Sequence, residues 1–246
     1  SGSLSNELLE YSNEDIFKII TEIKENLESE DALVEEPDLK RPEWFTLTDQ
    51  SKSYKTEDFR LTPVDVPSRL TRYIKRLVLV ERLREASALI GFTRLDSFGE
   101  VIDSDQEITV ERVPLYKFKN DSFPANEIRG EGIFIQFDED AISQWEKLAC
   151  VAKREEEFFY AHRSFRQAHF FANPEDNFPG IRYVLLHTLS HALIRQLSLS
   201  CGYPVASIRE RIYSASDDPK GPMAGILLYT AAPDSEGTLG GLVEMG

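Results

Sequence analysis

Apolar residues recur at helical spacing in three parts of the chain, which predicts three helices. The first follows an acidic helix start at residues 12–15, the second covers about 141–168 and the third about 181–199. Gly202 and then Pro204 follow the third helix, a combination that commonly ends helices. The apolar positions of the first helix are Ile16, Ile19, Ile20, Ile23 and Leu27.

Shorter apolar runs predict strands. Residues 132–137 and 225–230 have the composition of buried strands, residues 107–113 alternate acceptably, and 205–213 is expected to include a strand. Residues 69–95 fit either a helix or a strand. Residues 121–132, 173–180 and 214–222 are predicted to be loops.

These elements predict an α+β fold, or alternatively an open α/β fold, with a mixed sheet packed by long helices. The expected domains are an N-terminal helix and acidic linker over residues 1–62, forming a separate helical layer, and a mixed α/β domain over residues 63–246. The acidic composition of this linker, together with Pro37 and Pro42, indicates a connecting segment.

Composition narrows the classes of function. The chain has 246 residues, 41% of them hydrophobic, and a formal charge of −15. A free-standing DNA-binding domain usually has the opposite sign, so any DNA contact must be local. No apolar run approaches the roughly 20 residues of a membrane span, which predicts no membrane partner. Two cysteines without a signal peptide favour the cytoplasm.

His187 and His191 are four residues apart, so on a helix they share one face, as zinc-binding histidine pairs do. Thr188 takes the place of the general base that zinc hydrolases have after the first histidine. No carboxylate or cysteine has obvious ligand spacing, and two histidines are half of a tetrahedral shell. We therefore expect hydrogen-bonded histidines and no bound metal, with these two residues as the candidate ligands.

Basic residues in two segments are the candidate contacts to nucleic acid. The alternative is that their charged side chains simply form a solvated surface. They lie in the segment 69–84, which also contains Glu81, and in the aromatic-rich segment 158–171, where Phe158 and Phe165 are expected to face the core. The candidates are Arg69, Arg72, Lys75, Arg76, Arg163 and Arg166.

A glycine-rich loop follows the strand at 225–230, where α/β proteins often bind ligands. Its acidic residues would repel a phosphate, and a tight packing turn is the alternative. The candidate functional residues of this loop are Asp234, Glu236, Gly237, Thr238, Gly240 and Gly241.

Four segments together resemble the DrmB family of the bacterial DISARM antiphage systems. The more specific ones are HTLSHALIRQL at 187–197 and GILLYTAAPDSEGTLGGL at 225–242, and the weaker ones lie at 82–95 and 130–134. The region is also similar to the zinc-binding C-terminal domain of MrfA-type repair helicases. In that domain four cysteines hold the zinc, and we expect them beyond residue 241, in a longer protein.

The resemblance implies a non-catalytic accessory subunit of a phage-defence complex, which docks a DrmA-like helicase partner and helps to engage DNA. The absence of a Gly-x-x-x-x-Gly-Lys loop independently favours a subunit that is not a motor. Two alternatives stay open. One is a metal-dependent hydrolase that uses His187 and His191 with acidic loop residues, and the other is a purely structural protein-interaction module.

Overall fold

A computed structural model describes residues 39–49, 51, 54–89, 91–92, 113–115, 122–169, 171, 173–202 and 204–230. The strands are β1 (Arg60–Val64), β2 (Ile74–Ala88), β3 (Gly91–Phe92), β4 (Val113–Pro114), β5 (Ala125–Phe137), β6 (Ile208–Ala215) and β7 (Met223–Thr230). The helices are α3 (Lys40–Thr48), α4 (Glu139–Glu146), α5 (Ala149–Ala168), α6 (Gly180–Cys201) and the short 3₁₀ helix η3 (Val205–Ser207).

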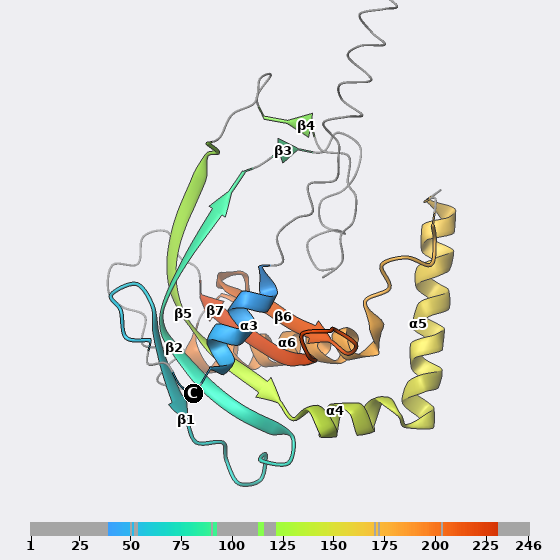
Figure 1. Ribbon diagram of the computed structural model, residues 1–246, viewed down its shortest axis with the longest axis horizontal. Helices are drawn as coiled ribbons and strands as arrows, with labels where there is room; N and C mark the ends of the chain where they lie inside the picture. The colour runs from blue at the N-terminus through green and yellow to red at the C-terminus, as the bar shows by residue number, and fades with distance from the viewer. Residues whose placement is uncertain are drawn as a thin grey trace, which may run out of the picture. The chain divides into compact units, whose positions relative to one another are not determined.

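Five strands form one antiparallel sheet in the order β1-β2-β5-β7-β6 (Figure 1). Because every pairing in it is antiparallel, the fold is α+β, as predicted, and the open α/β alternative is excluded. None of the described helices combines the length and the apolar character that a bilayer span needs.

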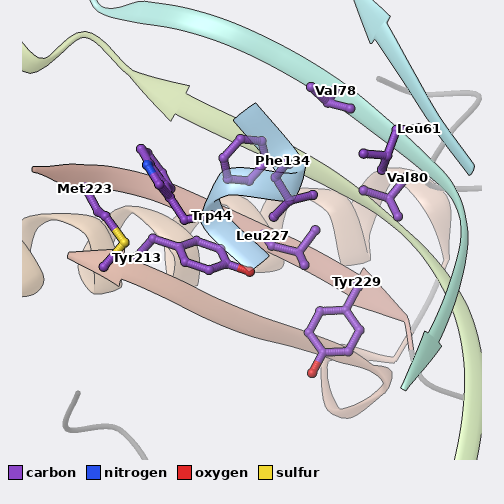
Figure 2. Packing of buried hydrophobic residues seen from close by; sticks show 10 residues of the cluster. Trp44, Leu61, Val78, Val80, Phe134, Tyr213, Met223, Leu227 and Tyr229 are labelled. Atoms are coloured by element: carbon purple, nitrogen blue, oxygen red, sulfur yellow. The ribbon is translucent and has the colours of Figure 1, made fainter. Parts of the chain in front are cut away.

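The core lies on both faces of the sheet. All eight residues of β7 are buried, and they alternate between the two faces. Leu227 and Tyr229 join the cluster under α3 (Figure 2). Ile226 and Leu228 join the opposite cluster, which α4 and α6 complete. The apolar composition that predicted a buried strand at 225–230 thus reflects burial on two sides.

Helix α3 occupies part of the segment expected to be linker. Its Trp44 is 7% exposed and lies 5.8 Å from the ring centroids of both Phe134 and Tyr213 (Figure 2). The Tyr213 hydroxyl donates to Glu43 at 3.0 Å, and burial, followed by the charge of Glu43, raises the pKa of Tyr213. Among the described residues, α3 thus packs in the same core cluster as the sheet, although it lies within the segment 1–62 that was expected to form a separate layer.

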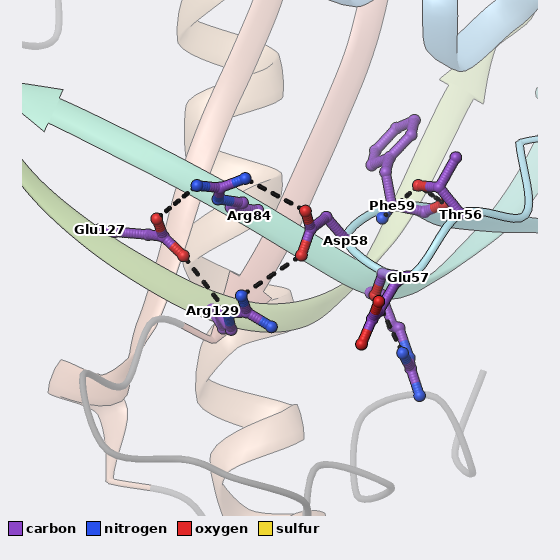
Figure 3. A network of polar contacts seen from close by, with 8 residues as sticks. Thr56, Glu57, Asp58, Phe59, Arg84, Glu127 and Arg129 are labelled. Carbon is purple, nitrogen blue, oxygen red and sulfur yellow. Dashed lines mark hydrogen bonds and ion pairs between the residues drawn. The ribbon is translucent and has the colours of Figure 1, made fainter.

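Strands β2 and β5 form a long antiparallel pair, and β5 includes most of the segment expected to be a loop at 121–132. The polar residues of this segment have partners on β2, on β5 itself and just before β1, so they do not need a loop. Arg84 contacts Asp58 at 3.1 Å and Glu127 at 2.6 Å, and Arg129 contacts the same two carboxylates at 3.3 and 3.4 Å (Figure 3). Hydrogen bonding to Arg84 is the main cause that lowers the pKa of Glu127.

The helix expected at about 141–168 is divided into α4 and α5 by the extended backbone of Leu148. Both ends of α4 are held by one side chain of α6. Arg182 contacts Glu139 at 2.6 Å and Glu146 at 2.7 Å, while α5 leaves in a new direction (Figure 1). The break at Leu148 therefore allows α5 to run in a different direction from α4.

Helix α6 confirms the third predicted helix. It ends at Gly202, whose φ of 74° is the left-handed conformation expected of a C-terminal glycine. The predicted N-terminal helix over residues 12–27, and all but the last residue of the predicted strand at 107–113, lie outside the described residues.

Candidate functional site

Helix α6 brings His187 and His191 together, because residues four apart on a helix lie one above the other. Their Nε2 atoms are 2.8 Å apart, and the ring of Tyr183 lies 5.4 Å from the ring of His187, centroid to centroid. The side chain of His187 is 29% exposed and that of His191 is 61% exposed. The pair therefore lies where the buried face of α6 meets the surface.

Strand β6 supplies a third group to this pair. The Oε1 atom of Glu210 is 3.1 Å from His187 Nε2 and 3.3 Å from His191 Nε2. Glu210 shares a face of β6 with Ile208 and Ile212, which pack in the core cluster with α6. This alternation aims the carboxylate at the helix, and the Glu210 side chain is only 15% exposed.

Among the residues that the structure describes, this is the place where three metal-ligand groups converge. One nitrogen of each histidine and one oxygen of Glu210 all lie within 4.8 Å of one another. We call His187, His191 and Glu210 the histidine–glutamate cluster. In the structure, the two histidines contact each other and a carboxylate of β6.

Sequence spacing missed Glu210 because the contact is tertiary. A signal was nevertheless present: in the segment 208–212 the acid occupies the same period-two position as two isoleucines. A carboxylate on the apolar face of a strand is costly unless it has a partner, which marks it as a residue to explain.

Of the candidate nucleic-acid residues, Arg69, Arg72 and Lys75 are exposed at the start of β2 and in the turn before it. Arg72 lies over the ring of Tyr73, 4.7 Å from its centroid. Within the described residues, no carboxylate is within ion-pair distance of these three cations. We call them, with Tyr73, the basic turn.

The backbone of the basic turn is well held. The amide nitrogens of Tyr73 and Ile74 both donate to the carbonyl of Leu70 at 2.8 Å, and the amide of Asp138 donates to the carbonyl of Tyr73 at 2.8 Å. The turn is thus anchored to the residue that caps α4, so its cations project from a defined backbone.

The other three candidate cations have structural partners. Arg76 donates to the carbonyl of Thr48. Arg163 contacts Glu175 at 3.2 Å. Arg166 is 9% exposed, donates to the carbonyl of Asn173 at 3.2 Å and lies 4.3 Å from the ring centroid of Phe171. The structure therefore does not bring the six candidates together as one surface.

Two further expectations concern the aromatic segment and the glycine-rich loop. Phe158 and Phe165, expected in the core, are 39% and 45% exposed, whereas Phe159 packs against Phe178 with ring centroids 5.5 Å apart. The expected functional loop residues, Asp234, Glu236, Gly237, Thr238, Gly240 and Gly241, lie outside the described residues.

Two comparisons relate the chain to known proteins. Residues 189–245 match the family model of the MrfA Zn-binding domain, a range that contains His191 and Glu210. The DISARM protein DrmB of Bacillus paralicheniformis is 37% identical over 214 residues, which are 87% of this chain and 36% of that protein. The chain therefore spans about a third of the length of this relative. By these two matches the chain is DrmB-like over most of its length and resembles the MrfA Zn-binding domain over residues 189–245.

Proposed function

We propose that the chain is part of a DISARM antiphage component and acts there as a non-catalytic accessory that docks a helicase partner and helps to engage DNA. The observation that carries the proposal is the identity of 37% to DrmB over 87% of the chain. The helicase partner and the cytoplasmic location follow from the role of an accessory in such a defence system.

The basic turn supports the DNA contact. Arg69, Arg72 and Lys75 can attract phosphates, and Tyr73, which is 48% exposed, offers a ring on which a base can stack. The net charge of −15 opposes binding over the rest of the chain. This balance favours weak and local DNA contact, which suits a subunit that works beside a stronger binder.

Zinc in the longer protein is a further part of the proposal, because the matched family is described as zinc-binding. The resemblance implies four cysteines for that zinc, so the histidine–glutamate cluster, whose imidazole nitrogens and carboxylate oxygen are also ordinary zinc ligands, would be a separate site. Bound zinc would hold the segments that supply its ligands together.

The metal-dependent hydrolase stays as a second candidate, because Glu210 gives His187 and His191 a third ligand. A hydrolase also needs a group that activates water. Thr188 stands after the first histidine, where zinc hydrolases with this histidine spacing have a glutamate. The accessory role therefore has the stronger support.

Replacing the three cations of the basic turn tests the DNA contact. We expect the variant R69A/R72A/K75A to bind a labelled DNA single strand roughly tenfold more weakly at low salt, because three phosphate contacts are lost. The slope of log affinity against log salt should fall by up to about 2, at about 0.7 for each lost contact. Fluorescence anisotropy measures both quantities.

The matched control is K147A/K153A/R154A, which removes three exposed cations from the region of α4 and α5 and changes the net charge equally. This control should bind DNA nearly as the parent does. If both variants lose affinity equally, net charge alone governs binding and the basic turn has no specific role.

A further inference from the structure

We propose that the histidine–glutamate cluster binds one divalent transition metal ion, with zinc as the preferred occupant. The ion would link the face of α6 to β6. The site is distinct from the four-cysteine zinc site implied by the family resemblance, because its donors are two imidazoles and a carboxylate. It is also independent of the proposed DNA contact, which uses the turn before β2 and other residues.

Two imidazole nitrogens and one carboxylate oxygen converge in the cluster. Two imidazole Nε2 atoms and Glu210 Oε1 lie 2.8, 3.1 and 3.3 Å from one another. If both imidazoles carry their proton on Nδ1, each Nε2 atom directs a lone pair into the space between them, and the Glu210 carboxylate directs a third. This arrangement is favourable only around a cation. Protons on the Nε2 atoms can take the place of that cation, so protons and the metal ion compete for the same lone pairs.

The triangle that the three atoms form is close in size to one face of a tetrahedral zinc site. Zinc binds nitrogen and oxygen at about 2.0–2.2 Å in tetrahedral geometry. Donors at such distances are separated by about 3.3 Å along each edge of the tetrahedron. The three separations in the cluster come within about half an ångström of that edge, so binding requires only small side-chain movements.

The carboxylate of the cluster is largely buried. Glu210 lies between Ile208 and Ile212 on the core-facing side of β6, and its side chain is 15% exposed. A carboxylate in such surroundings has lost part of its hydration, so a cation there is worth more than at an exposed site. A divalent ion with two neutral imidazoles and one carboxylate would leave a net charge of +1.

The fourth coordination position would face solvent, since the His191 side chain is 61% exposed. Three protein ligands with one open position can take water or a side chain from a partner protein. The metal would also brace an edge of the sheet, because β6 pairs with β7 and forms the end of the strand order.

A titration with Co²⁺ tests the site, because cobalt replaces zinc and its visible absorption reports tetrahedral coordination. The parent chain, purified without a histidine tag and freed of metal, should bind one Co²⁺ and show a visible band that one equivalent of Zn²⁺ abolishes. Zinc should also raise its melting temperature. No intense near-ultraviolet thiolate band is expected, because neither Cys150 nor Cys201 is among the proposed ligands.

The test variants are H187A/H191A and E210Q, and the matched control is H162A/H169A, which removes the remaining two of the four histidines. Both test variants should bind zinc at least about 100-fold more weakly, since even outer partners of a metal ligand contribute 10–100-fold. The control should bind as the parent does. E210Q keeps the shape of the side chain, so it separates loss of a ligand from loss of folding, which circular dichroism monitors.

The proposal is overturned if the parent binds zinc no more tightly than H187A/H191A, or if E210Q binds as tightly as the parent. A thiolate band in the cobalt spectrum would equally contradict it, because the cysteines would then hold the metal. Loss of DNA binding by the basic-turn variant would leave this result unchanged, so the two proposals fail separately.

Discussion

Replacing Arg182 with alanine is expected to lower the free energy of unfolding by about 3 kcal/mol. The Arg182 side chain is 5% exposed and contacts Glu139 at 2.6 Å and Glu146 at 2.7 Å. It also donates to the carbonyls of Ala215 at 2.7 Å and Met223 at 3.3 Å. One guanidinium therefore joins α4, α6 and two strands, and its loss leaves four groups without their donor.

The size of the expected loss in the free energy of unfolding follows from how deeply Arg182 and its two carboxylate partners are buried. Burial alone lowers the pKa of Arg182, but hydrogen bonds to Glu146 and Glu139 and their charges outweigh it, so the net pKa is raised. Loss of one member of a buried ion pair costs about 3–5 kcal/mol. The lower end applies because Glu139 and Glu146 are 34% and 21% exposed and can regain some hydration.

Urea unfolding followed by circular dichroism measures this effect. The matched control is R154A, which removes an arginine from an exposed pair with Glu157, where the side chains are 64% and 50% exposed. The control should change stability by less than about 0.5 kcal/mol. Equal effects of R182A and R154A would mean that the buried pairs do not hold α4 in place.

Replacing Trp44 with alanine is expected to cost about 3–5 kcal/mol of stability. Trp44 fills the space between α3 and the sheet, where its ring meets Phe134 and Tyr213 (Figure 2). The substitution leaves a cavity that the β-strands cannot close without moving. The same experiment tests whether residues 40–48 belong to the folded domain.

The neighbouring aromatic residue Phe45 provides the control, because it is in the same helix but is 50% exposed. F45A should cost less than about 1 kcal/mol, since exposed side chains lose little burial. If W44A unfolds at the same urea concentration as the parent, α3 does not contribute to the core.

The sequence predicted the α+β class, the buried strand β7 and the end of α6, because each has a strong local signal. β7 is a continuous apolar run between turns, and the glycine after α6 has the conformation that ends helices. These features depend on residues that are neighbours in the chain.

The failures have a shared physical cause in tertiary contacts. Residues 40–48 look like an acidic linker with a proline, yet Trp44 and Arg41 are 7% and 2% exposed in the packed helix. The polar segment around Glu127 and Arg129 looks like a loop, but its charges are balanced by Arg84 on β2 and by Asp58, which precedes β1. The long helix divides at Leu148 without a glycine or proline to mark the break.

The candidate site was predicted only in part for the same reason. The helical spacing of His187 and His191 was sufficient to place both on one face. Glu210 comes from a different element, and its contact depends on how β6 packs against α6. The candidate nucleic-acid residues were also predicted only in part, because Arg76 and Arg166 have structural partners that sequence spacing does not reveal.

The most direct test of the accessory role compares DNA binding by the chain alone with binding by the chain together with the helicase of the same defence system. A labelled DNA single strand is titrated at two salt concentrations, with the helicase alone as the reference. We expect weak and strongly salt-dependent binding by the chain alone, because its net charge of −15 leaves only local attraction. The mixture should bind more tightly than either protein separately. Tight binding by the chain alone that salt barely changes, or no gain of the mixture over the helicase, would contradict the proposed accessory function.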